Sequence, residues 1–369
     1  GDRAARINPR FDGSHYACTL AASIDTAPGM ARQRRYLRRM GLYACDVAQE
    51  ALAHAALRRG EPGGSGMCTP ERLGLFFGYG GLRAHWDDLM PAFEQQHADA
   101  HSAWQHGLTL LHPFWMLQHL SNNAHAIAAQ ELQARGDGAT YGGANAGAQA
   151  LSAAIRALAA GAVDVALVVA YDTLIEPEML VELAARGVLN CAREAASVAA
   201  PYAANACGFI PGEAAAALVL QRPQPGSLAC VQALAAGDGS AQEAQAATLA
   251  RLASKLARPG DWFDGAGLAE SAFDMQEREA LARIAGSDTP LTCTLSAMGQ
   301  TGAASSLVQA IALLELLQRR MLAPVAGLAQ MVAGPMQVLT QATPCSARSA
   351  VALSSGAPGL AAAVRVALV

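Results

Sequence analysis

The sequence predicts an α/β fold built from two similar halves. In each half, a short strand breaks into a turn of small residues, and a helix begins directly after the turn. The first unit has its strand and turn, its helix and its returning strand at residues 136–147, 148–160 and 163–170. The second unit has its strand, turn and helix at residues 291–295, 296–304 and 305–317. Strand, tight Gly/Ala turn, helix and strand form a βαβ unit, and its recurrence indicates an internal duplication.

The first half opens with an irregular segment over residues 1–30, and a long helix is predicted over residues 31–59. Apolar side chains near helical spacing predict this helix: Leu37, Met40, Ala44, Val47 and Leu52. A Gly/Pro/Ser loop at 60–66 separates the helix from a short apolar strand at 73–77. Residues 82–135 are expected to be mainly helical.

The second half is expected to continue the alternation of strands and helices. Further strands and a helix are predicted at 212–220, 228–236 and 274–284, and a closing hairpin of apolar strands at 350–354 and 361–368. No linker separates the two halves. We therefore expect residues 1–205 and 206–369 to form two halves that share one core.

Composition excludes several classes of function. Of the 369 residues, 52% are hydrophobic, which is enough for one large core. Only 15% are charged and the net charge is -4, so no footprint for nucleic acid is predicted. No apolar run is long enough to span a bilayer, and no signal peptide is visible, so a cytoplasmic protein is expected. The first residue is Gly1 and not Met, which suggests that N-terminal sequence is missing.

The cysteines and histidines do not predict a metal site. The 8 cysteines are scattered singly, without a CxxC pair, so buried reduced thiols are expected in place of zinc ligands or disulfides. His97, His101 and His106 have helical spacing, but no acidic or thiol partner recurs beside them. A solvated or interface face is favoured there, and no cofactor or metal is predicted.

The turn at 142–147 is a place where a nucleophile would be expected. A side chain at position 144 would lie at the positive end of the dipole of the following helix, which lowers the pKa of a cysteine and activates it. The residue there is Ala144, which has no nucleophilic atom, and small residues also allow plain close packing of the backbone. All 9 histidines lie at or before His125, so the second half can supply no imidazole.

The sequence lacks the common motifs of dinucleotide-binding proteins, P-loop proteins and serine hydrolases. The glycines at 78–81 do not form GxGxxG, and neither GxxxxGK[ST] nor GxSxG occurs. An acidic run interleaved with Arg278 and Arg283 is expected to form a solvated helix face. Its members are Asp261, Asp264, Glu270, Asp274, Glu277 and Glu279.

The order of five segments resembles the β-ketoacyl-ACP synthase family. The segments are His112–Trp115, Ser121–Ala124, the turn at 142–147 with Arg156 and Gly161–Asp164 after it, Phe263–Gly267 with Asp274–Glu277, and Ser296–Ala304. The last three are similar to the family's T-A-C-x-x-G, A-H-G-T-x-T-P…D-x-x-E and S-M-T-G-H-x-x-G-A-A-G motifs, and Gly356–Gly359 resembles a remnant of its G-F-G-G-T-N turn. The resemblance covers about residues 7–369 and implies a thiolase-like, duplicated α/β/α/β/α layered fold. The family's first strand, usually V-T-G-x-G, is apparently missing.

Each of the catalytic motifs lacks its diagnostic residue. The resemblance places Ala144 at the nucleophilic cysteine, Asp264 at the first histidine and Gln300 at the second. Decarboxylative condensation needs a thiolate to hold the acyl chain and two imidazoles to stabilise the enolate and the oxyanion. Alanine cannot be acylated, an anionic Asp264 would repel an oxyanion, and Gln300 cannot supply a cation. The resemblance therefore implies a chain without condensing activity of its own.

The resemblance also implies a role beside an active enzyme. In type II polyketide systems a catalytically empty homologue, the chain-length factor, pairs with an active ketosynthase in a pseudo-twofold heterodimer and shapes the end of its acyl tunnel. Related pairs occur in aryl-polyene and fatty-acid-type pathways. The implied partners are an active ketosynthase and an acyl carrier protein with its phosphopantetheine-bound acyl chain. The segment with Phe114, Trp115 and Met116 would cross the dimer interface near the tunnel, although these residues also suit an ordinary core.

Two other functions stay open on the sequence. The first is a divergent acyltransferase or decarboxylase on the same fold that uses Gln300, Asp264 or a displaced cysteine such as Cys207. The second is a scaffold or carrier-docking protein outside polyketide synthesis.

Overall fold

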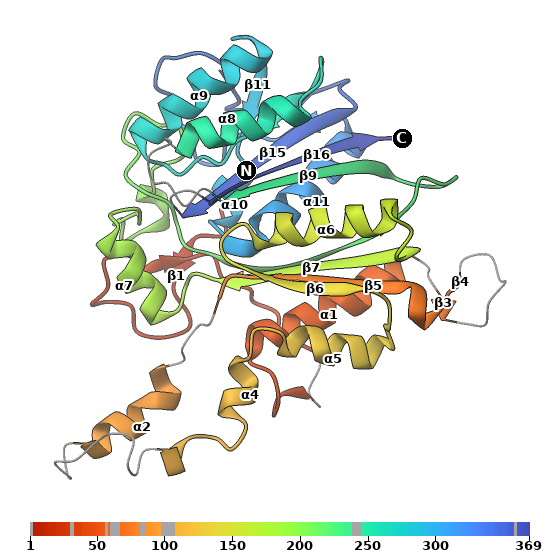
Figure 1. The fold of residues 1–369 in the computed structure, drawn as a ribbon. Helices are drawn as coiled ribbons and strands as arrows, with labels where there is room; N and C mark the ends of the chain where they lie inside the picture. The colour runs from red at the N-terminus through yellow and green to blue at the C-terminus, as the bar shows by residue number, and fades with distance from the viewer. Residues whose placement is uncertain are drawn as a thin grey trace.

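The computed structural model describes residues 3–29, 33–55, 58–59, 67–81, 86–96, 108–237, 245–357 and 360–369. Two β-sheets lie one above the other, with a layer of helices between them and further helices on both outer sides (Figure 1). The layers therefore follow the order α/β/α/β/α that the sequence predicts.

The first sheet has four strands in the order β6-β5-β7-β8. Their bounds are β6 Gly138–Gly142, β5 Leu73–Tyr79, β7 Val165–Thr173 and β8 Glu213–Gln221. β5 pairs with β6 and β7 in parallel, whereas β8 pairs with β7 in antiparallel orientation. β7 is almost fully buried and reads as a continuous apolar run, as expected of a strand covered on both faces.

The second sheet has six strands in the order β13-β11-β10-β15-β16-β9. Their bounds are β13 Gln337–Val338, β11 Pro290–Thr292, β10 Trp262–Asp264, β15 Ser349–Ala357, β16 Leu360–Leu368 and β9 Ala229–Gly237. β10 pairs with β11 and β15 in parallel, and β15 pairs with β16 in antiparallel orientation. The run β11-β10-β15-β16 thus repeats the order and orientation of β6-β5-β7-β8, and the predicted duplication is confirmed.

Helices fill the remaining three layers. α6 (Ala146–Ala159) and α11 (Ser305–Arg319) lie between the sheets, α1 (Arg39–His54) and α5 (Asn123–Leu132) cover the outer side of the first, and α8 (Gln245–Leu256) and α9 (Ser271–Ala285) cover the second (Figure 1). The other helices are α2 (Trp86–Gln96), α4 (Trp115–His119), α7 (Pro177–Ala185) and α10 (Leu295–Met298). Short elements complete the chain: β1 (Arg6–Ile7), β2 (Leu20–Ala21), β3 (Arg58–Arg59), β4 (Met67–Cys68), β12 (Met321–Leu322), β14 (Thr343–Pro344) and the 3₁₀ turns at 70–72, 108–110, 195–197 and 302–304.

Several expected boundaries were wrong. The first helix begins at Arg39 and not at residue 31, because residues 33–36 form turns and Arg38 is extended. β11 ends at Thr292, and the next residues turn into α10 instead of continuing the strand to 295. α7, α8 and β10 were not predicted. The loop at 60–66 and the histidines at 97, 101 and 106 lie outside the described residues.

The expected burial of the cysteines was only partly right. Cys18, Cys45 and Cys293 are buried. Cys191, Cys207 and Cys230 are exposed. No His/Cys/Asp/Glu group suited to a metal ion occurs in the part of the chain that the structure describes. Within that part, no helix is long and apolar enough to cross a membrane.

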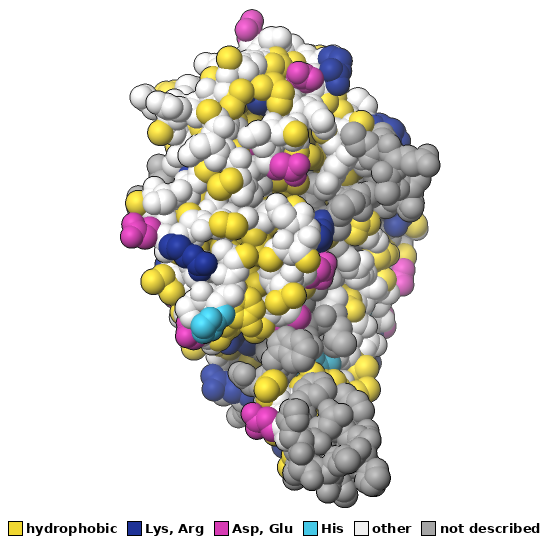
Figure 2. Space-filling view, turned by 90° about the vertical axis from the view of Figure 1, so that its left-hand side faces the viewer, with side chains coloured by type: hydrophobic (Ala, Val, Ile, Leu, Met, Phe, Trp, Pro, Cys, Tyr) yellow, Lys and Arg dark blue, Asp and Glu magenta, His cyan; other side chains and the backbone are white. Residues whose placement is uncertain are grey.

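The surface agrees with the low content of charged residues. On the face shown in Figure 2, Lys and Arg side chains are scattered among apolar and uncharged ones and form no continuous basic area.

The last strand of the first sheet, β8, comes from the chain after residue 205. How the chain divides between its two halves stays a prediction.

Candidate functional site

A cavity of about 130 Å³ lies just beyond the carboxyl ends of β5 and β7. Its wall combines apolar side chains with a few polar ones. The apolar part consists of Leu174, Met179, Leu183, Phe209 and Leu360, and the polar part includes Asp172, Glu182, Arg186, Gln300 and Ser355. Ala144 lines the same cavity, so the structure brings two of the three predicted positions, Ala144 and Gln300, together.

The turn before α6 places Ala144 at the start of that helix. Gly143 has a φ of 111°, a conformation that favours glycine, and it lets the chain turn from β6 into α6. Asn145 then ties the turn to the second half, because its Nδ2 donates a hydrogen bond of 3.2 Å to the carbonyl oxygen of Ala361. A Cβ on Gly147 would lie 2.5 Å from the carbonyl oxygen of Ala303, so α6 approaches the second half closely. Ala144 thus lies just before α6 and at the cavity, and its methyl group has no reactive atom.

Gln300 is held from both its main chain and its side chain. Its N–H donates to the carbonyl oxygen of Ile210 at 2.9 Å, and its own carbonyl accepts the N–H of Gly212 at 2.8 Å. The side-chain Nε2 donates to the carbonyl oxygen of Ala266 at 3.0 Å. Gln300 is 5% exposed. Gln300 is therefore a neutral group that is fixed in place, and one hydrogen bond of its side-chain amide is already made to Ala266.

Asp264 does not join the other two positions. It lies in β10, is fully buried and does not line the cavity. Its carboxylate accepts the N–H of Thr294 at 2.7 Å, the Thr294 hydroxyl at 2.6 Å and Nε2 of Gln309 at 3.1 Å. Burial raises the pKa of Asp264 to about 6, against the lowering effect of these hydrogen bonds. The expectation that this carboxylate would face a developing oxyanion is not supported by its placement. The side-chain amide of Gln300 instead contacts Ala266.

The expectation that the acidic run would be solvated was only partly right, because Glu270 and Glu279 are exposed but Asp261 and three further members are buried. Asp264, Asp274 and Glu277 are buried. Glu277 accepts the N–H groups of Ala266 and Gly267 at 2.8 and 3.2 Å and the Tyr202 hydroxyl at 2.8 Å. Glu277 thus fixes the loop that presents Ala266 to Gln300.

Asp274 holds the main chain at Tyr202 in a similar way. Its Oδ2 accepts the N–H of Tyr202 at 2.7 Å. Burial raises the pKa of Asp274 to about 7, and burial also raises the pKa of Glu277. These carboxyl groups hold loops in place and do not line the cavity.

The chemistry available in the cavity is limited. Among the described residues, its wall contains no cysteine and no histidine. Glu182 and Arg186 form an ion pair of 3.8 Å, and the Ser355 hydroxyl donates to the carbonyl oxygen of Leu360 at 3.0 Å. Asp172 accepts the N–H of Ala303 at 3.0 Å. The cavity offers apolar side chains to an apolar group and polar side chains to a hydrogen-bonding one, but the described wall shows neither a thiolate nor an imidazole for acyl transfer.

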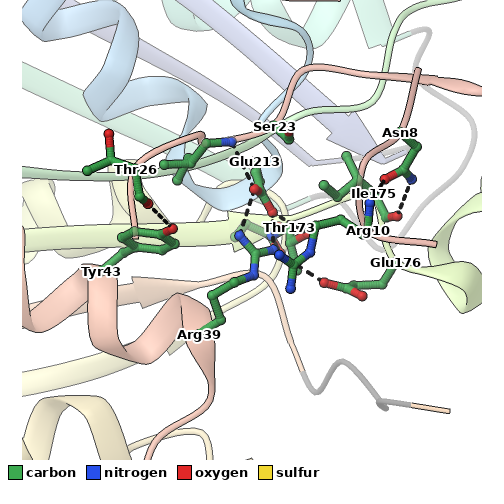
Figure 3. Close-up of polar contacts among 12 residues, drawn as sticks. Asn8, Arg10, Ser23, Thr26, Arg39, Tyr43, Thr173, Ile175, Glu176 and Glu213 are labelled. Atoms are coloured by element: carbon green, nitrogen blue, oxygen red, sulfur yellow. Dashed lines mark hydrogen bonds and ion pairs between the residues drawn. The ribbon is translucent and has the colours of Figure 1, made fainter. Parts of the chain in front are cut away.

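Sequence reasoning missed a buried ionic cluster next to this site (Figure 3). Arg39, at the start of α1, forms a two-pronged ion pair with Glu213 of β8 and a further contact of 3.4 Å with Glu176. Glu213 also accepts the N–H of Ile24 at 3.0 Å and the Thr173 hydroxyl at 3.2 Å. The signal that the sequence offers is Glu213, a charged residue at the start of an alanine-rich strand.

The predicted tunnel and interface residues lie apart from the cavity. Phe114 precedes α4, and Trp115 and Met116 begin it. α4 and α2 project below the first sheet (Figure 1). Phe114 and Met116 are 41% and 68% exposed. They are surface residues in this chain, not core residues, and their role at an interface stays a prediction.

Comparison with known proteins assigns the family. A family model described as the beta-ketoacyl synthase N-terminal domain matches residues 10–225, more than half of the chain. No curated protein matches. Several solved structures share the fold over the whole chain and 93% of their own length.

Three of these structures illustrate the likeness. A β-ketoacyl synthase from Burkholderia phymatum STM815 has a TM-score of 0.84 at 19% identity. The ishigamide ketosynthase/chain length factor has a TM-score of 0.82 at 20% identity. A type II PKS acyl-carrier protein in complex with its ketosynthase, bound to the hexaketide, has a TM-score of 0.76 at 17% identity. Taken with the family model, the repeated sheets and the placement of Ala144 at the start of α6, these findings establish that the chain belongs to the β-ketoacyl synthase family.

Proposed function

We propose that this protein is a non-catalytic ketosynthase-fold subunit that pairs with an active β-ketoacyl synthase and shapes its acyl tunnel, as a chain-length factor does. The observation that carries the proposal is Ala144 at the start of α6, in a cavity where the other predicted catalytic position, Gln300, is a neutral amide. Type II polyketide, aryl-polyene and fatty-acid-type synthesis are the pathways in which such a pair would work.

The loss of chemistry is specific and the scaffold around it is intact. A thioester intermediate needs a nucleophilic atom at position 144, and a methyl group offers none. A developing oxyanion needs preorganised donors, yet the Gln300 amide hydrogen bonds to the Ala266 carbonyl oxygen at 3.0 Å. A turn, a helix and hydrogen bonds to the second half nevertheless hold these residues in place. This combination favours a structural role for the fold.

The exposed apolar residues around α4 support a partner surface. Leu110, Phe114, Met116 and Leu120 are 46%, 41%, 68% and 49% exposed, which places four large apolar side chains within one short projecting segment. Such clustering is typical of interaction sites. We propose that this segment contacts the active ketosynthase, and that Trp115 and Met116 set the length of its acyl chain. An acyl carrier protein with a phosphopantetheine-bound chain is the second proposed partner.

The test is co-expression with an intact ketosynthase, one that has the cysteine and both histidines, from the same genome. We expect a heterodimer that condenses acyl chains, while this chain alone shows no condensation. Met116→Arg should weaken the heterodimer, whereas the matched change Val181→Arg, at a 60% exposed site on α7, should not. A stable homodimer in the presence of that ketosynthase would contradict the proposal.

The same preparation tests the alternative of a divergent acyltransferase or decarboxylase. After incubation with acyl-carrier protein substrates, mass spectrometry of this chain should show no covalent acyl adduct. An adduct on Ser355, which lines the cavity, or on exposed Cys207 would favour the enzymatic alternative.

A further inference from the structure

A second cavity, the α4 cavity, lies on the side of the first sheet opposite to the cavity at Ala144. Its volume is about 80 Å³. The ends of β5 and β7 separate the two cavities, because successive side chains of a strand point to opposite faces. Tyr79 and Tyr171 line the α4 cavity, whereas Gly80 and Asp172 line the other one. The starts of α1 and α5, on the outer side of the sheet, and the end of α4 complete its wall (Figure 1).

The α4 cavity reaches the surface that we propose for the partner ketosynthase. Leu120, directly after α4, lines the cavity and is 49% exposed. It is also one of the four large apolar side chains of the proposed partner surface. Leu110, another of the four, is 46% exposed and is not part of the cavity wall. A chain that crosses the interface beside Leu120 would therefore reach Tyr79 and Tyr171.

The two tyrosines offer hydroxyl groups that the protein itself does not use. They are register partners on parallel strands, and their ring centres lie 6.3 Å apart. Both are partly buried, and neither hydroxyl has a hydrogen-bond partner among the described residues. The hydroxyls of Tyr43 and Tyr202, by contrast, each donate a hydrogen bond to the protein. Burial raises the pKa of Tyr171, so its hydroxyl stays a neutral donor. An enclosed donor without a partner is unfavourable, and a ligand oxygen would satisfy it.

The charged side chains of the wall already have counter-charges within the protein. Arg38 pairs with Asp88, and Arg39 pairs with two glutamates, of which Glu176 lines the cavity. Burial lowers the pKa of His119, which favours the neutral imidazole. An ionic ligand would therefore bring an unmatched charge into a partly enclosed space. The wall suits a neutral group with an acceptor oxygen, and the apolar side chains of α1 and α5 suit the carbon atoms around it.

We propose that the α4 cavity binds the keto-bearing end of the acyl chain, with Tyr79 and Tyr171 donating hydrogen bonds to a keto oxygen. This inference rests on the proposed function, because the chain comes from the active ketosynthase through the surface at α4. It also selects among the pathways named above: a polyketide chain carries keto oxygens, whereas a polyene or saturated chain would leave both donors without a partner. The volume of about 80 Å³, against about 10–15 Å³ for one water, leaves room for several heavy atoms.

The first experiment uses the chain alone and two small probes, 2-heptanone and hexanoate, titrated by ligand-observed NMR. We expect 2-heptanone to bind about tenfold or more tightly than hexanoate, because the carboxylate has no free counter-charge in the cavity. Tyr79→Phe combined with Tyr171→Phe keeps both rings and removes both donors. This double variant should weaken ketone binding about tenfold, since each lost hydrogen bond is worth a few-fold. Tyr141→Phe, at a partly buried tyrosine outside the cavity wall, is the matched control and should leave binding unchanged.

The second experiment uses the heterodimer with the active ketosynthase. The double phenylalanine variant should extend 7-oxooctanoyl thioesters about tenfold more slowly, because both hydrogen bonds are lost, and should extend octanoyl thioesters as before. Leu120→Trp narrows the cavity where it meets the partner surface, so the longest product should be shorter by at least one extension step. Leu110→Trp, on the same surface but outside the cavity wall, should leave the product length unchanged.

Either of two results would overturn the inference. One is a chain that binds 2-heptanone no better than hexanoate, or whose double phenylalanine variant binds the ketone equally well. The other is an active heterodimer in which that double variant and Leu120→Trp change neither the preference for the keto chain nor the product length. The comparison of the two probes needs no variant, so it stands whether or not the variants fold. Failure of the proposed function gives a different result: the ketone binds with the expected dependence on the tyrosines, but no heterodimer forms.

Discussion

The side-chain amide of Gln300 donates a hydrogen bond of 3.0 Å to the main-chain carbonyl oxygen of Ala266. Both residues are buried, and Glu277 fixes the loop that carries Ala266. Asp264, two residues earlier, is instead hydrogen bonded to Thr294 and Gln309. We infer that Ala266, and not Asp264, is the position where an imidazole would have to stand to act together with position 300.

This relationship predicts the outcome of restoring the catalytic residues. Ala144→Cys should be alkylated by iodoacetamide faster than buried Cys293, because the start of α6 favours the thiolate whereas burial raises the pKa of Cys293. The single variant should not decarboxylate malonyl groups on a carrier protein, because no imidazole is present. Adding Ala266→His and Gln300→His should produce decarboxylation, since positioned acid–base groups contribute about 10²–10⁴-fold each.

The matched variant for that experiment replaces Asp264, not Ala266, by histidine in the same Ala144→Cys, Gln300→His background. It should stay inactive, since the side chain at position 264 is directed to Thr294 and Gln309, whereas position 266 contacts Gln300. Equal decarboxylation by the two triple variants would contradict the assignment of Ala266. Thermal unfolding checks both proteins, because a histidine at fully buried position 266 is expected to cost about 1–3 kcal/mol through overpacking.

Asp264 is predicted to act in stability and not in catalysis. Asp264→Ala removes the acceptor for three hydrogen bonds, two from Thr294 and one from Gln309. A buried donor left without a partner costs about 1–3 kcal/mol, so we expect the free energy of unfolding to fall by about 3 kcal/mol or more. Asp264→Asn should cost less because one carbonyl acceptor is kept. Urea titration measures both, with exposed Asp288→Asn as the control, which should be nearly neutral. An Asp264→Ala protein as stable as this control would refute the structural role.

Much of the fold could be predicted because its signals are local. The turn at 142–147 and the turn at 296–304 each combine small residues with a following helix, and the structure places α6 and α11 there. The site was harder to predict, because it depends on which face of a loop a residue occupies. Asp264 and Ala266 are two positions apart. Only their hydrogen bonds show that Asp264 is a buried acceptor for Thr294, whereas Ala266 contacts Gln300. The acidic run was misjudged for a similar reason: its charges are satisfied by main-chain N–H groups of distant loops, which leave no pattern in the sequence.

The buried carboxyl groups predict how stability depends on pH. The pKa of Asp274 is raised to about 7 by burial, against an ordinary value of about 3.9 in an unfolded chain. The folded state therefore favours the neutral acid. The contribution of Asp274 to the free energy of unfolding is fully present below about pH 4 and is lost as the pH rises to about 7, with a slope of at most about 1.4 kcal/mol per pH unit.

Asp274→Asn should therefore reduce the loss of stability between mildly acidic and neutral pH, while its carbonyl oxygen can still accept the N–H of Tyr202. Urea titrations at several pH values measure the slope. Asp288→Asn, at an exposed site, should leave the slope unchanged. If Asp274→Asn and the original chain lose stability in parallel as the pH rises, Asp274 is not the titrating group.

The ionic cluster around Arg39 predicts that removing Arg39 lowers stability strongly and that a second substitution, at Glu213, restores most of it (Figure 3). The Glu213 side chain is 0% exposed, and Arg39 is its cationic partner. Arg39→Met would leave the Glu213 carboxylate buried without that partner, which typically costs about 3–5 kcal/mol. Arg39→Met combined with Glu213→Gln should recover most of the loss, because the remaining amide can still accept the N–H of Ile24 and carries no charge. Arg319→Met is the control, since the Arg319–Glu315 pair is 73% and 55% exposed and should change the free energy of unfolding by less than about 1 kcal/mol. A double variant no more stable than Arg39→Met alone would mean that Arg39 acts by packing α1 against β7 and β8 and not by compensating the charge of Glu213.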